Sequence, residues 1–125
     1  MKTTRVLIFS EDEGLLELYG MVFQALHLNN MVTALDRSTV LALLQSKFDL
    51  IFLDVFTGIG ISTHEQHDEL IRTAQSLQPE TPIILVSDTP PGQNRRVFAT
   101  IALPFTLDEA CEPVYRALKL PVPPR

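Results

Sequence analysis

The chain has 125 residues, of which 46% are hydrophobic and 20% charged, a composition that fits one globular domain with its own core. The formal net charge of −5 excludes the clustered basic surface that binding to a nucleic-acid backbone requires, so we expect no nucleic-acid partner for this domain alone. The amino-terminal apolar run is short and is interrupted by acids, which excludes a signal peptide or membrane span and predicts a cytoplasmic protein without membrane contact.

The first part of the chain alternates strand-like and helix-like patterns. Residues 5–9 form a continuous apolar run that is typical of a strand buried on both faces. Residues 13–27 carry apolar side chains at helical spacing, and their leading acids suit the positive end of a helix dipole. Residues 31–34 predict a weaker strand. Asp36 or Ser38 can then cap a second helix.

The middle of the chain repeats this alternation more strongly. Residues 49–54 are the clearest buried-strand signal in the sequence, and the run ends in the carboxylate of Asp54 just before a glycine-containing loop. The polar residues 62–66 lead into a third helical pattern, which Pro79 closes. Residues 82–87 form another apolar strand that ends in a polar group.

The last part of the chain supplies one more strand and one more helix. The turn-rich stretch 88–92 leaves room only for a short helix before a strand over residues 97–102. Thr106 or Asp108 opens the final helix, in which Pro113 costs an internal hydrogen bond unless the helix kinks there. The final helix also holds the only cysteine, Cys111, which excludes an internal disulfide and is predicted to be a small buried hydrophobe. Residues 121–125 are rich in proline and read as a tail or the start of a linker after a domain spanning residues 1–120.

Five strands that alternate with helices predict an α/β fold with a five-stranded parallel sheet and helices on both faces. In such sheets the functional residues lie beyond the carboxyl ends of the strands. Ser10, Glu11, Asp12, Asp54 and Ser87 follow or end predicted strands at that edge. Clustered carboxylates repel one another unless a cation relieves them, and Mg²⁺ is the divalent ion that best suits such oxygen ligands.

Four segments carry a resemblance to a known family: residues 5–13, 47–54, 81–87 and 103–105. They resemble the CheY-like receiver domains of bacterial two-component response regulators, which have a flavodoxin-like fold, and the resemblance covers nearly the whole chain. It implies that Asp54 accepts a phosphoryl group from a histidine kinase or a phosphotransfer protein. It also implies that Ser87 hydrogen-bonds the phosphoryl group and moves on activation.

The resemblance also implies a Mg²⁺ site. The acid pair of the family falls on Ser10 and Glu11 if the sequences align without a gap, and on Glu11 and Asp12 if one residue is inserted. Both registers remain open, and Glu11 belongs to both. The further ligands would be Asp54 and the main-chain carbonyl of Phe56.

Several positions depart from the family. Leu103 stands where receivers have a lysine, and loss of that positive charge should slow phosphoryl transfer. Arg95 or Arg96 could compensate, although nothing in the sequence places either at the site. Thr100 stands at the position of the switch aromatic residue, and the loop over residues 55–60 differs from the family pattern.

The same residues have simpler interpretations. Asp54 could accept backbone N–H bonds, although a carboxylate at the end of a buried strand is costly without a purpose. The acids from Glu11 to Glu13 could serve only the helix dipole, and Ser87 could bond to the backbone. His64 and His67 have metal-like spacing, but we interpret them as solvated surface residues.

Two functions therefore remain in view, and neither is that of a true enzyme. The first is a receiver whose phosphorylation on Asp54 shifts it towards a partner-binding state, with at most self-phosphorylation and dephosphorylation chemistry. The second is a phosphorylation-independent pseudo-receiver that binds a downstream protein through the face formed by residues 90–118. A hydrolase with Asp54 as nucleophile lacks a general base and a substrate-recognition element. The cognate kinase, the output partner, a following effector domain and the oligomeric state stay open.

Overall fold

Five parallel strands form one sheet in the computed structural model, which describes residues 4–28, 30–55, 63–87, 97, 99–102 and 107–119. The strand order is β2-β1-β3-β4-β5, so the chain reverses its direction of growth after β2. The strands are β1 (Arg5–Phe9), β2 (Asn30–Ala34), β3 (Leu50–Asp54), β4 (Ile83–Ser87) and β5 (Ala99–Ala102). The predicted five-stranded parallel sheet is confirmed, although the last strand is shorter than the expected 97–102.

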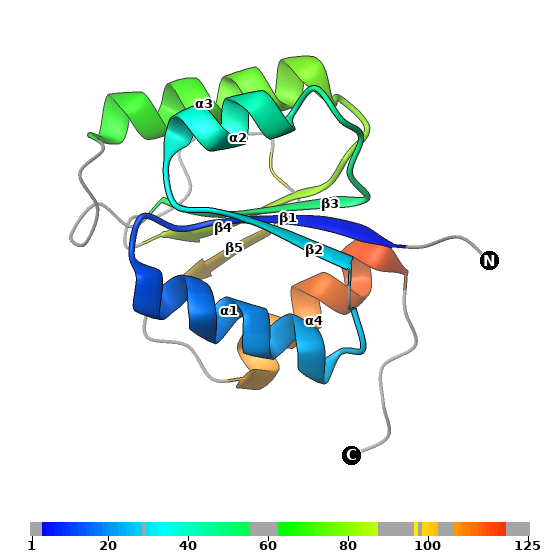
Figure 1. The fold of residues 1–125 in the computed structure, drawn as a ribbon. Coiled ribbons are helices and arrows are strands. Elements are labelled where there is room, and N and C mark those ends of the chain that lie inside the picture. The colour runs from blue at the N-terminus through cyan, green and yellow to red at the C-terminus, as the bar shows by residue number, and fades with distance from the viewer. Residues whose placement is uncertain are drawn as a thin grey trace.

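Helices cover both faces of this sheet, as predicted. Figure 1 shows α2 and α3 together on one face, and α1 and α4 on the other. The helices are α1 (Glu13–Ala25), α2 (Arg37–Leu43), α3 (His64–Leu77) and α4 (Leu107–Leu118). None of the helices in the described part of the chain is long and apolar enough to span a membrane.

The two faces bury two separate apolar clusters, because alternate side chains of a strand point to opposite sides. Phe52 packs with residues of α1 and α4, whereas Leu53 packs with residues of α2 and α3. Every residue of β3 and β4 is buried. Burial on both faces explains why these strands read as continuous apolar runs rather than as an alternating pattern.

Side-chain caps fix where three helices begin. Asp36 accepts a hydrogen bond from the Thr39 N–H at 2.7 Å, so it is Asp36, and not Ser38, that caps α2. Thr63 caps α3 through a reciprocal capping box with Gln66. Asp12 caps α1. These caps satisfy backbone donors that would otherwise lack partners in the first turn of each helix.

The carboxyl-terminal helix departs from expectation in detail. α4 begins at Leu107, which places Asp108 inside the helix, and Pro113 lies buried within it. Thr106, the other predicted opening residue, lies outside the described residues. Cys111 is partly buried against the cluster that contains Phe52, rather than fully buried. The turn-rich stretch 88–92, the short helix expected between it and residue 97, and the tail over 121–125 lie outside the described residues.

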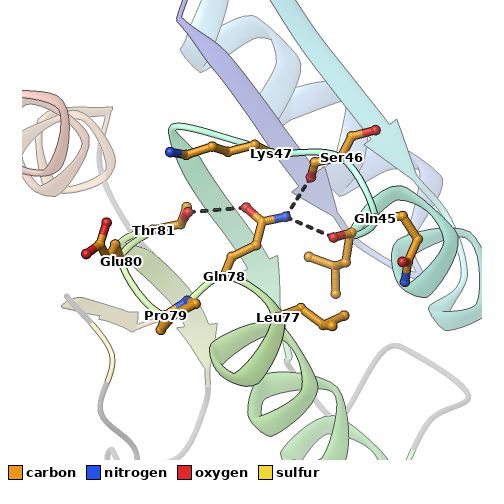
Figure 2. Close-up of a pocket in the computed structure, with 9 residues that line it drawn as sticks. Gln45, Ser46, Lys47, Leu77, Gln78, Pro79, Glu80 and Thr81 are labelled. Atoms are coloured by element: carbon orange, nitrogen blue, oxygen red, sulfur yellow. Dashed lines mark hydrogen bonds between the residues drawn. The ribbon is translucent and has the colours of Figure 1, made fainter.

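A pocket of about 340 Å³ opens at the amino-terminal end of β3 and β4, where α2 and α3 end. Figure 2 shows the side chain of Gln78 reaching across it towards the turn that precedes β3. Its amide nitrogen donates to the carbonyls of Leu44 at 3.1 Å and Ser46 at 2.6 Å. Its amide oxygen accepts from the Phe48 N–H at 3.0 Å and the Thr81 hydroxyl at 3.2 Å. Gln78 therefore joins two connecting turns at the end of the sheet opposite to Asp54.

Candidate functional site at the carboxyl edge of the sheet

Asp54 is the last residue of β3, and its side chain is buried at the carboxyl edge of the sheet with 6% exposure. Two hydroxyl groups donate to the same carboxylate oxygen. Ser10 Oγ lies 3.0 Å from Asp54 Oδ2, and the Tyr19 hydroxyl lies 2.9 Å from it. A carboxylate that accepts such bonds can be accommodated in a site with little water.

Ser10 reaches Asp54 because strands β1 and β3 are parallel neighbours. Phe9, the last residue of β1, pairs with Leu53, so the next residue of each strand meets across the sheet edge. Ser10 is almost fully buried, and its Oγ also accepts a hydrogen bond from the Asp12 N–H at 3.1 Å. That second contact orients the Ser10 hydroxyl proton towards Asp54.

Tyr19 comes from the buried face of α1. Its ring meets Phe52 edge to face, with centroids 5.1 Å apart, and Phe52 in turn meets Phe23 at 5.3 Å. Phe52 lies two positions before Asp54 in β3, so the same strand holds both the ring and the hydroxyl of Tyr19. Sequence reasoning assigned Tyr19 only to the apolar face of a helix and missed this polar contact. The signal that could have indicated this contact is that a tyrosine on the buried face of a helix needs a hydrogen-bond partner for its hydroxyl group.

The bond to Asp54 should make stability depend on alkaline pH. Burial, followed by the nearby Asp54 carboxylate, raises the pKa of the Tyr19 phenol well above its usual 10.0. The folded state thus keeps a proton that the unfolded state releases, so this contribution is complete below pH 10.0 and declines as the pH rises further. Between about pH 10 and about pH 11, the free energy of unfolding of the wild type should therefore fall. In Tyr19→Phe the fall should be smaller, and urea denaturation at the two pH values measures both. Equal slopes in the two proteins would contradict this assignment.

Glu11 and His67 form a second polar pair at this edge. Glu11 Oε1 lies 3.3 Å from His67 Nε2, and both side chains are buried. The prediction that His67 is a solvated surface residue is wrong, because His67 is only 1% exposed. It lies three and four positions before the buried Leu70 and Ile71, on the core-facing stripe of α3, and this spacing was the missed signal. Among the described residues, His67 Nδ1 is buried without a hydrogen-bond partner. The side chain of His64 lies outside the described part of the structure.

The three candidate residues for the acid pair of the family, Ser10, Glu11 and Asp12, make three different contacts. Ser10 contacts Asp54, Glu11 contacts His67, and Asp12 accepts the Leu15 N–H at 2.8 Å as the cap of α1. The contact with Leu15 therefore agrees with the simpler interpretation of Asp12, as an acid at the start of a helix. The residue that donates to Asp54 from the end of β1 is a serine rather than an acid.

Ser87 ends β4 at the same edge of the sheet. Asp54 pairs with Val86, so Ser87 lies one position further along the neighbouring strand, and it is buried. The structure thus brings Asp54 and Ser87 to adjacent strand ends. Phe56, Leu103, Arg95 and Arg96 lie outside the described residues.

The contacts at this edge test whether the described residues suit Mg²⁺. Magnesium requires several oxygen ligands in a nearly octahedral arrangement. No three His, Cys, Asp or Glu residues come together in a metal-holding group within the described ranges. Asp54 Oδ2 already accepts two hydroxyl donors, and Asp12 is used as a cap. In this arrangement the described carboxylates of Asp54, Glu11 and Asp12 each contact a protein partner and do not form a cluster of ligands.

Comparisons with known proteins agree on the fold. No protein-family model and no curated protein matches the sequence. Among solved structures, the chain is similar to the chemotaxis response regulator CheY4 of Vibrio cholerae, with 21% identity, a TM-score of 0.74, and coverage of 94% of this chain and 100% of that one. It is also similar to a CheY-like receiver domain protein from Methanospirillum hungatei, with 19% identity, a TM-score of 0.79 and coverage of 94% and 95%.

A third similar structure is the signal receiver domain of a two-component histidine kinase from Clostridium thermocellum, with 15% identity and a TM-score of 0.80. The aligned region covers 95% of this chain and 100% of that structure. All three match the fold of this chain over nearly their whole length. The chain therefore has the flavodoxin-like fold of CheY-like response-regulator receiver domains.

Proposed function

We propose that this domain is a pseudo-receiver, a cytoplasmic protein-protein interaction module of two-component signalling that acts without phosphorylation. The observation that carries the proposal is the state of Asp54. Its carboxylate is buried, and two hydroxyl groups, from Ser10 and Tyr19, donate to the same oxygen.

Phosphoryl transfer to an aspartate depends on an accessible carboxylate oxygen and on cations that stabilise charge on the transferring group. At this site two neutral donors occupy the neighbourhood of Asp54 Oδ2. A serine stands beside Asp54 where an acid would help to hold a cation, and Leu103 replaces the lysine expected from the family resemblance. Each of these differences lowers the capacity for phosphoryl transfer.

A pseudo-receiver would act through its surface. We propose that a downstream protein binds the face formed by residues 90–118. Within the described part of that face, α4 exposes Glu112 and Arg116, which form an ion pair at 2.9 Å. Surface pairs of this kind contribute little to stability, so these charges remain available to select a partner.

The second candidate is a working receiver, and the adjacent strand ends of Asp54 and Ser87 favour it. In this case Asp54 accepts a phosphoryl group from a histidine kinase or a phosphotransfer protein, and Ser87 hydrogen-bonds that group. Glu11, Asp12, Asp54 and the main-chain carbonyl of Phe56 would be the candidate ligands for Mg²⁺. A bound Mg²⁺ would supply charge neutralisation, and Glu11 would first have to leave His67.

Intact-mass spectrometry after incubation with phosphoramidate, with and without Mg²⁺, separates the two candidates. We expect no phosphoryl adduct on the wild type, Asp54→Asn or Asp36→Asn, while an active receiver treated in parallel becomes modified. Asp36 is an exposed helix cap and provides the matched aspartate control. A Mg²⁺-dependent adduct on the wild type and Asp36→Asn that is absent from Asp54→Asn would replace our proposal with the second candidate.

A further inference from the structure

The two hydroxyl groups at Asp54 occupy one of its two carboxylate oxygens, Oδ2. A carboxylate oxygen has about two lone-pair positions, and Asp54 Oδ2 receives two donors, from Ser10 and Tyr19. Both donors present hydrogen atoms to that oxygen. A cation that approached Oδ2 would therefore meet positively polarised hydroxyl protons instead of free lone pairs.

Neither hydroxyl can turn away cheaply. The Ser10 hydroxyl oxygen also accepts the Asp12 N–H, which leaves its proton to point towards Asp54. The Tyr19 ring is held by its edge contact with Phe52, from the same strand as Asp54. Ser10 and Tyr19 are both almost completely buried, so water cannot replace a lost partner.

From this geometry we propose that Ser10 and Tyr19 act as a hydroxyl latch, two hydroxyl donors that keep divalent cations off Oδ2 of Asp54, with Tyr19 as its positioning residue. The latch stabilises the carboxylate through these two hydrogen bonds. It also ties α1 to β3 through a contact between residues 35 positions apart. This inference rests on the proposed function, because it explains how the site remains stable without cation or phosphoryl group.

The test is a gain of metal binding. Magnesium chloride is titrated into the wild type, Tyr19→Phe, Ser10→Asp and the double variant, and amide NMR shifts are followed. Tyr19→Phe removes one donor but keeps the ring against Phe52, and Ser10→Asp supplies a second carboxylate beside Asp54. Tyr115→Phe is the matched control, because Tyr115 is the other tyrosine of the chain.

We expect the wild type and Tyr115→Phe to show no saturable shifts. Tyr19→Phe should bind Mg²⁺ at least about tenfold more tightly than the weakest binding that the wild-type titration could have detected. About tenfold is the change in affinity that corresponds to losing one hydrogen bond to a charged group. The double variant should bind more tightly still, and adding Asp54→Asn should abolish the gain. If Tyr19 has only a structural role, Tyr19→Phe should change the free energy of unfolding but should not produce Mg²⁺ binding that depends on Asp54.

The outcomes distinguish the latch from the proposed function. Saturable, Asp54-dependent Mg²⁺ binding by the wild type would overturn the latch, whereas only a phosphoryl adduct on Asp54 would overturn the pseudo-receiver proposal. If the wild type does not bind and folded Tyr19→Phe does not bind either, the latch is overturned while the pseudo-receiver proposal stands. Tyr19→Phe decides the test if Ser10→Asp or the double variant fails to fold, and circular dichroism establishes folding in each case.

Discussion

Phe52→Ala is expected to lower the free energy of unfolding by about 3–5 kcal/mol, the usual cost of truncating a buried aromatic residue. Phe52 is almost fully buried in the central strand β3. Its ring contacts those of Tyr19 and Phe23 edge to face, so alanine leaves a cavity with two aromatic walls. Urea denaturation, monitored by far-ultraviolet circular dichroism, measures the loss.

The control for this variant is Phe48→Ala. Phe48 has the same burial as Phe52 but belongs to the cluster on the other face of the sheet, away from Tyr19. We expect both variants to lose stability, whereas only Phe52→Ala should change the near-ultraviolet tyrosine signal of the folded protein. An unchanged tyrosine signal in Phe52→Ala would show that Phe52 does not position Tyr19.

Gln78→Ala is expected to lower the free energy of unfolding by about 2–3 kcal/mol, because it leaves buried backbone groups without partners. The Phe48 N–H loses its acceptor, and the carbonyls of Leu44 and Ser46 lose a donor. Water entering the adjacent pocket can restore part of this hydrogen bonding, which keeps the expected loss below the sum of the separate bonds.

Gln45→Ala is the matched control for Gln78→Ala, because Gln45 lines the same pocket but is exposed. Its effect should stay within about 0.5 kcal/mol, as is usual for surface positions. Urea denaturation of both variants gives the comparison. Equal stabilities for Gln78→Ala and the wild type would show that solvent fully replaces the side-chain amide. Since this turn lies at the end of the sheet away from Asp54, we expect no change in the tyrosine signal from either variant.

These two predictions separate the stability of the two ends of the sheet. Phe52 supports the edge that carries Asp54, through the ring of Tyr19. Gln78 supports the opposite edge, where the turns before β3 and β4 meet.

The alternation of strands and helices could be predicted from the sequence because its physical causes are local. Strands buried on both faces must be continuously apolar, as residues 50–54 and 83–87 are. Helix caps also leave a local signal, and Asp36 is one that the structure bears out. The placement of Asp54 at the sheet edge followed from the same reasoning, since parallel strands end together at one side.

The chemistry around Asp54 was decided only by the tertiary structure. Helical spacing placed Tyr19 on a buried face but could not name its partner, because the Tyr19–Asp54 bond joins residues 35 positions apart. The contact of His67 with Glu11 spans 56 positions and was missed entirely. The sequence by itself thus determined the fold and the edge at which polar residues gather, since periodicity and burial are local properties. Which hydroxyl, imidazole or carboxylate groups meet there depends on the packing of α1 and α3 against the sheet, which no local pattern encodes.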